Sequence, residues 1–119
     1  MLNEQEYNAF WNSFGLKAYD ENTVPDNASL PYITYEYAEN GFDDGEIALT
    51  ANLWDGGKSW EYISKIADNI KHAIGYGGVM IKTDEGYIWI KRRSPFAQRT
   101  ADPNDNIRRI MLNLSVEFF

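Results

Sequence analysis

Residues 55–59, Asp-Gly-Gly-Lys-Ser, are of a type that can do chemistry, because a glycine turn followed by Lys-Ser can hold a phosphate. A nucleotide-binding loop of this kind needs another glycine five residues before Gly57, where the chain has Asn52. Asp55 would also repel the phosphate. We therefore interpret 55–59 as a tight turn from a strand into a helix, with Ser59 capping the helix.

Residues 102–106, Asp-Pro-Asn-Asp-Asn, carry oxygen-bearing side chains at alternate positions, as calcium loops do. The loop's glycine position holds Ile107 and its twelfth position holds Asn113, so we interpret the segment as a polar turn. The single histidine, His72, lies beside Lys71 on the polar side of a predicted helix, and the chain has no cysteine. The sequence therefore predicts no catalytic residue, no metal site and no cofactor.

Hydrophobic periodicity predicts the elements that would position any site. Apolar residues near helical spacing predict a short helix at 2–15 and a longer, strongly amphipathic one from residue 58 to Gly75. Alternating apolar residues predict strands at 31–39, 47–54 and 108–119, a strand–turn–strand unit at 79–93 and a brief extended piece at 17–19. Polar loops are predicted at 18–31, 40–46 and 94–106.

This order predicts an α+β fold in one domain, residues 1–119. We expect a mixed, mainly antiparallel sheet with one long helix packed on one face and a short N-terminal helix. The second face of such a sheet would leave apolar side chains in need of cover, and a subunit interface is one source of it. These side chains are Tyr87, Trp89, Met111 and Phe119.

The chain has 119 residues and a net charge of −7, which argues against a general affinity for nucleic acid or an anionic membrane. Residues 1–57 hold eleven acids and one lysine, −10, whereas residues 82–109 hold seven bases and four acids, +3. Asp43, Asp44 and Glu46 gather at a predicted turn, which we interpret as a solvated acidic turn. The acidic N-terminal segment predicts no signal peptide, and no apolar run is long enough to span a membrane.

Several landmarks resemble the tail terminator (tail completion) proteins of long-tailed bacteriophages, which are often called minor capsid proteins. They are "LPYITYEY" before a strand that ends in Trp54, a glycine turn, the helix "SWEYISKIADNIKHAI", and "DPNDNIRRIMLNLSVEFF" as a closing strand. The resemblance covers nearly the whole chain. It implies a structural protein rather than an enzyme, which forms a ring, usually a hexamer, on the end of the tail tube.

The same resemblance implies four partners: other copies of the chain, the tail tube protein, a head completion or connector protein, and DNA that only passes through the channel. It implies assembly in the host cytoplasm and a final place at the head–tail junction of the virion. Two other functions stay open, a head-side connector subunit and a small cytosolic ligand-binding domain that uses the aromatic sheet face.

A closed ring joins one patch to a different patch on its neighbour, so opposed charges on one chain suit it. We expect the basic residues to face a neighbour or the tube, and the acids to meet them or line the channel. The basic set is Lys91, Arg92, Arg93, Arg99, Arg108 and Arg109, and the acidic set includes Asp20, Glu21, Asp26, Asp43, Asp44 and Glu46.

Overall fold

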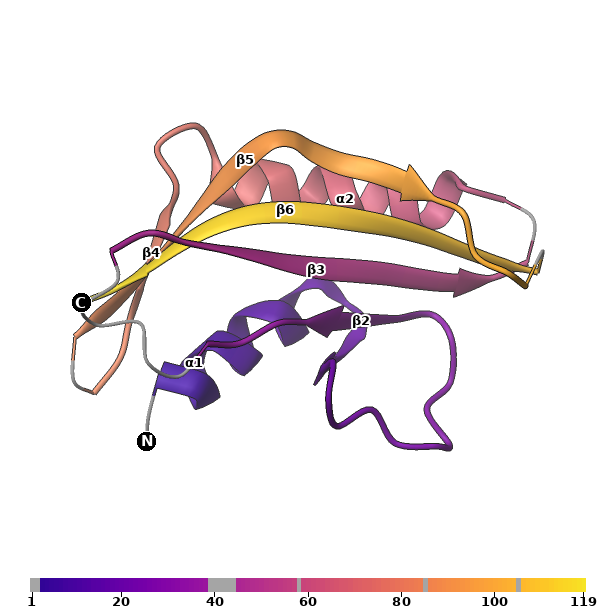
Figure 1. Cartoon of the computed structure of the whole chain (residues 1–119), viewed down its shortest axis with the longest axis horizontal. Coiled ribbons are helices and arrows are strands. Elements are labelled where there is room, and N and C mark those ends of the chain that lie inside the picture. Colours follow the sequence, from indigo (N-terminus) through magenta and orange to yellow (C-terminus); the bar gives the residue numbers. More distant parts are fainter. Residues whose placement is uncertain (1–2, 39–44, 58, 85, 105) are drawn as a thin grey trace.

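The computed structural model of the chain describes residues 3–38, 45–57, 59–84, 86–104 and 106–119 (Figure 1). Within these residues, two α-helices, a 3-10 helix and six strands follow one another. Their bounds are α1 Asn3–Trp11, η1 Asn12–Phe14, β1 Lys17–Asp20, β2 Tyr32–Tyr35, β3 Ile47–Gly56, α2 Glu61–Ile74, β4 Val79–Lys82, β5 Tyr87–Thr100 and β6 Ile107–Phe118. The predicted α+β class is confirmed.

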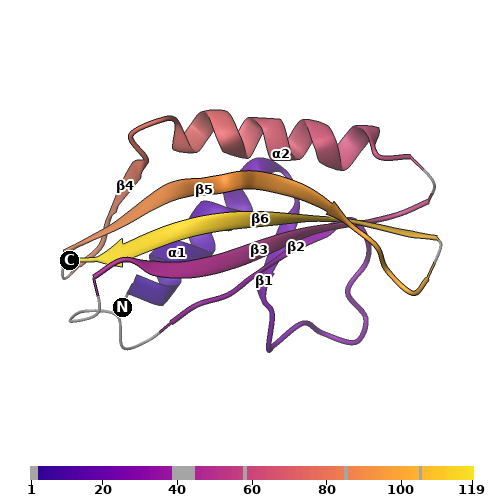
Figure 2. The same cartoon turned by 45° about the horizontal axis from the view of Figure 1, so that its top comes forward.

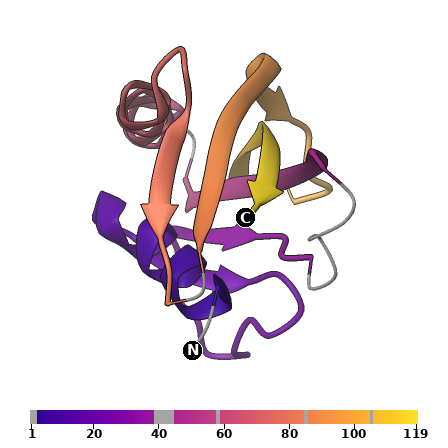
Figure 3. The same cartoon turned by 90° about the vertical axis from the view of Figure 1, so that its left-hand side faces the viewer.

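The strands form one sheet in the order β1-β2-β3-β6-β5-β4. The β1–β2 pair is parallel and the other pairs are antiparallel, which confirms the predicted mixed, mainly antiparallel sheet. β3, β5 and β6 are long, with 10, 14 and 12 residues, so the right-handed twist accumulates along them. The sheet is curled as a result, and β4 and β5 run across the direction of β2 and β3 (Figure 3).

β6 lies at the centre of this sheet, between β3 and β5. Its pairing with β3 is continuous from Ile47 opposite Val116 to Gly56 opposite Ile107. The side chains predicted to face the core are buried, and they are Ile110, Leu112, Leu114, Val116 and Phe118. The period of two in the last strand therefore describes its structure correctly.

α2 lies along β5 on one side of the sheet (Figure 2) and buries the apolar stripe that its periodicity predicts. The buried side chains of this helix are Ile63, Ile66, Ala67, Ile70 and Ile74. The helix ends at Gly75, which has a φ of +70° that suits glycine, and whose N–H donates to the carbonyl of Lys71 at 3.0 Å.

The expectation of one long helix as the cover of the sheet is wrong. α2 has 14 residues and shares the covered side with α1, which has nine (Figure 3). α1 contacts both edge strands, β1 and β4, because the curl brings the two edges of the sheet toward each other. Its Tyr7 and Trp11 are fully buried in the same core as the side chains of α2.

The polar connection predicted at 94–106 is wrong for residues 94–100, because β5 continues to Thr100, whereas residues 101–104 and 106 do connect β5 to β6. The pairing of β5 with β6 shifts between Arg92 and Ala97, and Pro95 lies in this irregular part, where no ladder N–H is needed. Asn113 of β6 donates its amide to the Pro95 carbonyl at 2.8 Å. The strand therefore continues through polar residues here, which an alternating hydrophobic pattern does not predict.

The brief extended piece predicted at 17–19 is confirmed as the edge strand β1. The side chain of Asn12 covers its free edge: the Ala18 N–H donates to Asn12 Oδ1 at 2.9 Å, and Asn12 Nδ2 donates to the Ala18 carbonyl at 3.4 Å. The strand predicted at 31–39 is shorter, Tyr32–Tyr35. The predicted turn at 40–46 lies mostly outside the described residues.

Candidate functional site

The basic residues predicted to face a neighbouring copy or the tube lie at separate places in the fold. Residues directly opposite each other in an antiparallel pair share a face of the sheet. Arg92 pairs with buried Leu114 and Arg99 with buried Ile110, so both lie on the helix side. Lys91 comes directly before Arg92 in β5, so it lies on the opposite face of the sheet, the outer face that the helices do not cover. The long strands therefore divide the basic set between the two faces.

Arg99 and Arg108 lie on the same aromatic ring at one end of the sheet. Their guanidinium carbons are 4.8 and 5.5 Å from the centre of the Trp60 ring, just before α2 begins. Trp60 itself is partly buried against the core. Such cation–π contacts hold long side chains in place on a rigid support.

Arg109 lies on the outer face, 4.9 Å from the Trp54 ring centre. Its Nε donates to Asn52 Oδ1 at 2.9 Å, and the Trp54 indole N–H donates to Thr34 Oγ1 at 2.9 Å. These contacts link side chains of β2, β3 and β6 into one polar group on the outer face. Arg109 is therefore held by its own chain on this face.

Aromatic side chains extend this group toward the edge of the sheet. The Trp54 and Tyr32 ring centres are 6.5 Å apart, and those of Tyr32 and Tyr19 are 5.8 Å apart. Tyr19 and Tyr32 meet at 82°, so each ring packs its edge on the next. The row is a set of mutual contacts and not a flat stacking platform.

Lys91 contacts two side chains of its own chain. Its Nζ is 4.3 Å from the Trp89 ring centre and forms an ion pair with Glu46. Lys91 was predicted to meet an acid on a neighbouring copy, but its acidic partner is Glu46 of the same chain. The other acids of that turn, Asp43 and Asp44, lie outside the described residues.

Arg92 and Arg93 lie where β5 leaves its regular pairing with β6. The Arg92 guanidinium carbon is 4.9 Å from the ring centre of Tyr76, a fully exposed side chain just after α2. Arg93 is exposed. Together with Lys71, these residues line a hollow of about 360 Å³.

Sequence reasoning found the cations but missed the aromatic rings that position them. Trp89 and Lys91 are two residues apart in one strand, so their shared face was readable from the period. The Trp54, Trp60 and Tyr76 contacts join residues far apart in the chain, and no local spacing signals them.

The acidic loop, which we define as residues 20–26 with Asp20, Glu21 and Asp26, leaves the sheet after β1. Its first residues are anchored: the Glu21 N–H donates to the Tyr35 carbonyl at 2.9 Å, and the Asn22 N–H donates to Asp20 Oδ1 at 2.8 Å. Partial burial and the neighbouring charges of Glu36 and Asp20 raise the pKa of Glu21, against an opposing effect of Arg109. The loop therefore starts in a region of excess negative charge.

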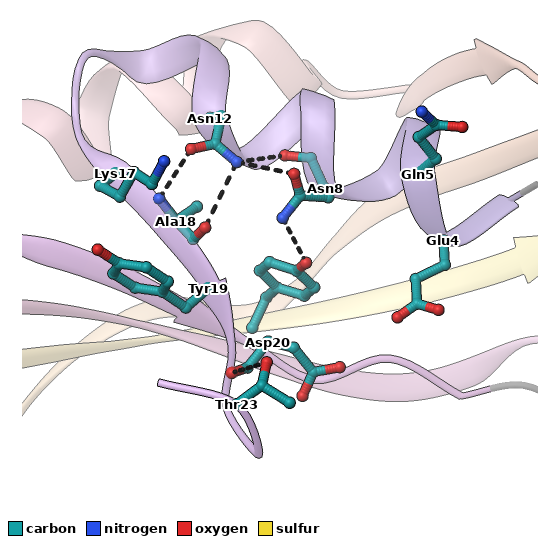
Figure 4. Close-up of a pocket in the computed structure, with 10 residues that line it drawn as sticks. Glu4, Gln5, Asn8, Asn12, Lys17, Ala18, Tyr19, Asp20 and Thr23 are labelled. Atoms are coloured by element: carbon teal, nitrogen blue, oxygen red, sulfur yellow. Dashed lines mark hydrogen bonds between the residues drawn. The ribbon is translucent and has the colours of Figure 1, made fainter. Parts of the chain in front are cut away.

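A polar hollow of about 730 Å³ lies between α1 and β1 (Figure 4), and sequence reasoning missed it. Asn8 Nδ2 donates to the Tyr35 hydroxyl at 2.6 Å, and Asn12 Nδ2 donates to the Asn8 carbonyl at 2.9 Å. Burial raises the pKa of Tyr35, the hydrogen bond from Asn8 lowers it, and the nearby charges of Asp20 and Glu4 raise it. The net effect is a raised pKa. The hydroxyl is therefore protonated at neutral pH, and the asparagines serve structural hydrogen bonds.

Three of the apolar residues predicted to need cover lie together at the end of the sheet that holds the β4–β5 turn. Tyr87 and Phe119 exchange backbone hydrogen bonds, and the Trp89 and Phe119 rings are 6.4 Å apart. Met80, opposite Trp89 in β4, adds a side chain that is 54% exposed. Met111 lies elsewhere, half-buried between Asn52 and Gln98.

The segments first considered for chemistry have structural roles. The Gly57 N–H donates to the Asn106 carbonyl at 2.7 Å, and Ser59 Oγ accepts from the Glu61 N–H at 3.1 Å, at the start of α2; Lys58 is outside the described residues. Asp102 Oδ1 accepts from the Asn104 N–H at 2.9 Å, as in a polar turn. Among the residues that the structure describes, no three His, Asp or Glu side chains gather as metal ligands do.

Comparison with protein-family models, with curated proteins and with solved structures finds no match to this chain. In the described part of the chain, neither helix has both the length and the apolar character that crossing a bilayer demands.

Proposed function

We propose that this chain is a structural subunit of a bacteriophage tail. It caps the tail tube as a ring, stops the addition of tube subunits and offers a surface for the head. The observation that carries this proposal is the separation of charge across the sheet. The acidic loop leaves the β1 edge, whereas the basic residues Arg92 and Arg93 belong to β5, next to the other edge.

A ring of identical subunits needs two different patches on each one, so that each copy presents a patch to the copy on either side. Opposed charges on different parts of the surface meet this need and disfavour wrong pairings. The resemblance to tail terminator proteins and the α+β fold with a mixed sheet agree with this role.

The direct test adds the purified protein to growing tail tubes and measures tube length by electron microscopy. We expect tubes of fixed length with the protein and continued growth without it. The variant Arg92→Glu, Arg93→Glu should fold normally and lose the effect. Unlimited tube growth in the presence of the folded native protein would refute the proposal, while binding to head connectors and not to tubes would favour the connector role.

The outer aromatic row of Tyr19, Tyr32 and Trp54 favours a second candidate, a small ligand-binding domain. Aromatic faces of this kind contact sugars or bases in other proteins. The Tyr19 and Tyr32 rings meet at 82°, so they do not form one continuous flat surface for stacking. A titration of tryptophan fluorescence with nucleotides and oligosaccharides distinguishes the two, because a saturable change that Trp54→Phe removes would support the ligand-binding domain.

A further inference from the structure

The basic hollow lies between the end of α2 and the part of β5 where its pairing with β6 shifts. Both segments are toward the top of Figure 1. The hollow measures about 360 Å³ and is lined by Lys71, Tyr76, Arg92, Arg93, Ser94 and Phe96. The described lining holds three cations and no acid. On a chain with a net charge of −7, this is a strong local concentration of positive charge.

Each cation reaches the hollow for a local structural reason. Lys71 is in the last turn of α2, where a cation offsets the helix dipole. Arg92 faces the helix side of β5 and lies on the Tyr76 ring. Arg93 follows at the point where regular pairing with β6 stops, which leaves it exposed. Three separate features therefore hold positive charge around one space.

Lys91, the neighbouring cation, differs from these three because it forms an ion pair with Glu46, an acid that also lines a second hollow with Arg92 and Arg93. Among the described residues, no ion pair involves Lys71, Arg92 or Arg93. Two arginines beside one lysine suit carboxylates, since guanidinium groups bind them through paired hydrogen bonds. The hollow thus fits an acidic peptide segment.

The acidic loop of a second copy has the matching properties. Asp20, Glu21 and Asp26 lie in one exposed-to-half-buried stretch that leaves the body of the molecule after β1 (Figure 1). The loop lies on the lower side of the molecule in Figure 1, whereas the end of α2 and β5 lie at its top, so loop and hollow are apart within one chain and can meet between copies. The backbone of Glu21 and the carboxylate of Asp20 are anchored at the start of this loop.

We infer that the basic hollow of one copy binds the acidic loop of the next, and that copies join head to tail through this contact. The inference rests on the proposed function and names the contact that would close the ring. Double-stranded nucleic acid is the less favoured occupant, because the remaining surface carries a net negative charge that repels a long polyanion.

Disulfide trapping tests the contact cleanly, because the native chain has no cysteine. Asn22→Cys places a thiol in the acidic loop and Ser94→Cys places one in the hollow, and both keep every charge. We expect the mixed pair to form a covalent dimer under mild oxidation. The matched control pairs Asn22→Cys with Tyr62→Cys, an exposed site in the first turn of α2, and should give at least about tenfold less product.

Charge reversal then identifies the attraction. Arg92→Glu with Arg93→Glu in the Ser94→Cys chain, or Glu21→Lys with Asp26→Lys in the Asn22→Cys chain, should each reduce the product by about tenfold or more. The two reversed chains mixed together should restore it, which a folding defect cannot do. No product from the native-charge pair at the highest concentration that stays in solution, or no restoration, would overturn the inference.

The outcomes also separate this inference from the proposed function. A charge-dependent covalent dimer whose native chain leaves tube length unlimited would keep the contact and refute tube capping. Fixed tube length with Arg92→Glu, Arg93→Glu would keep tube capping and refute the contact. Loss of binding to a DNA duplex in that variant, with the covalent dimer unchanged, would assign the hollow to nucleic acid and also refute it.

Discussion

At the scale of single residues, aromatic rings decide where the cations of this protein lie. Arg92, Arg99 and Arg109 each lie within 5 Å of a ring centre, on Tyr76, Trp60 and Trp54. A contact of this kind is worth about 0.5–1 kcal/mol at an exposed site. This favours one side-chain position by a factor of roughly 2–5, so these positive charges are biased toward particular places on the surface.

Glu21 provides a prediction on pH. Burial, Glu36 and Asp20 raise its pKa above the ordinary value of 4.5, so the folded state disfavours the ionised carboxyl. The protonated Glu21 side chain therefore stabilises the folded state below about pH 4.5. This stabilisation is lost as the pH rises through the raised pKa of Glu21. Glu21→Gln should raise the urea midpoint at pH 7.

The same variant should lose this advantage at pH 4, where the native carboxyl binds a proton. Urea unfolding of both proteins at the two pH values measures the difference. Asp26→Asn serves as the control on the same loop. An equal gain for Glu21→Gln at pH 4 and pH 7 would contradict the electrostatic explanation.

At the scale of elements, the two edges of the sheet are treated differently. The free edge of β1 is covered by the Asn12 side chain, which bonds both the N–H and the carbonyl of Ala18. An uncovered edge strand invites pairing with other chains, so this amide protects the molecule from aggregation. β1 is thus closed to strand pairing at Ala18.

Asn12→Ala should destabilise the protein by about 1–3 kcal/mol, because two backbone groups of Ala18 lose their partners. Hydrogen exchange of the Ala18 amide should accelerate, while exchange in β6 changes only by the global loss of stability. Ser13→Ala is the neighbouring control and should cost less than about 1 kcal/mol, since Ser13 Oγ bonds a single exposed carbonyl, that of Phe10. Unchanged protection of Ala18 in Asn12→Ala would contradict this role.

α1 is part of the core rather than an appendage, and a substitution measures this. Trp11 has no exposed surface and packs its ring against Tyr7 at 6.1 Å between centres. Trp11→Ala should cost about 3–5 kcal/mol by urea unfolding, as for large aromatic residues in other cores. Tyr62→Ala, on the exposed side of α2, should cost less than about 1 kcal/mol. A small loss for Trp11→Ala would mean that α1 docks independently of the core.

At the scale of the whole molecule, charge is distributed unevenly across a curled sheet with one covered side. The acidic loop lies at one edge, the basic hollow is near the other, and the apolar group of Met80, Tyr87 and Phe119 lies at the end of the sheet that holds the β4–β5 turn. Self-association, which we propose, could use either the charged or the apolar surface, and the two would respond to salt in opposite directions.

Salt dependence distinguishes these two modes. Raising the ionic strength from about 0.1 M to about 1 M shortens the Debye length from about 10 Å to about 3 Å. The head-to-tail contact through Arg92 and Arg93 should weaken by about tenfold or more over this range, as measured by sedimentation. Association that strengthens with sulfate salts and disappears in Met80→Ser would instead assign the contact to the apolar group.

The periodicity of the sequence determined the elements whose one face is buried. α2, β3 and β6 follow from their apolar spacing, because burial on one side imposes a period of 3.6 or 2 on the residues. The polar half of β5 was not predictable in this way, since residues 94–100 are mostly exposed and carry no apolar alternation. The sequence also identified the cations of β5 and β6 by their number and charge.

Only the tertiary structure decided how those cations are divided and what surrounds them. Adjacent residues of a strand face opposite sides, the pairing of β3 with β6 places Trp54 opposite Arg109, and the tertiary structure brings Tyr76 to Arg92 and Trp60 to Arg99, at the two ends of α2. It also joins α1 to both edges of the sheet, which made two helices share the side expected for one. Contacts between residues distant in the chain depend on twist and strand order, and local spacing does not encode either of these.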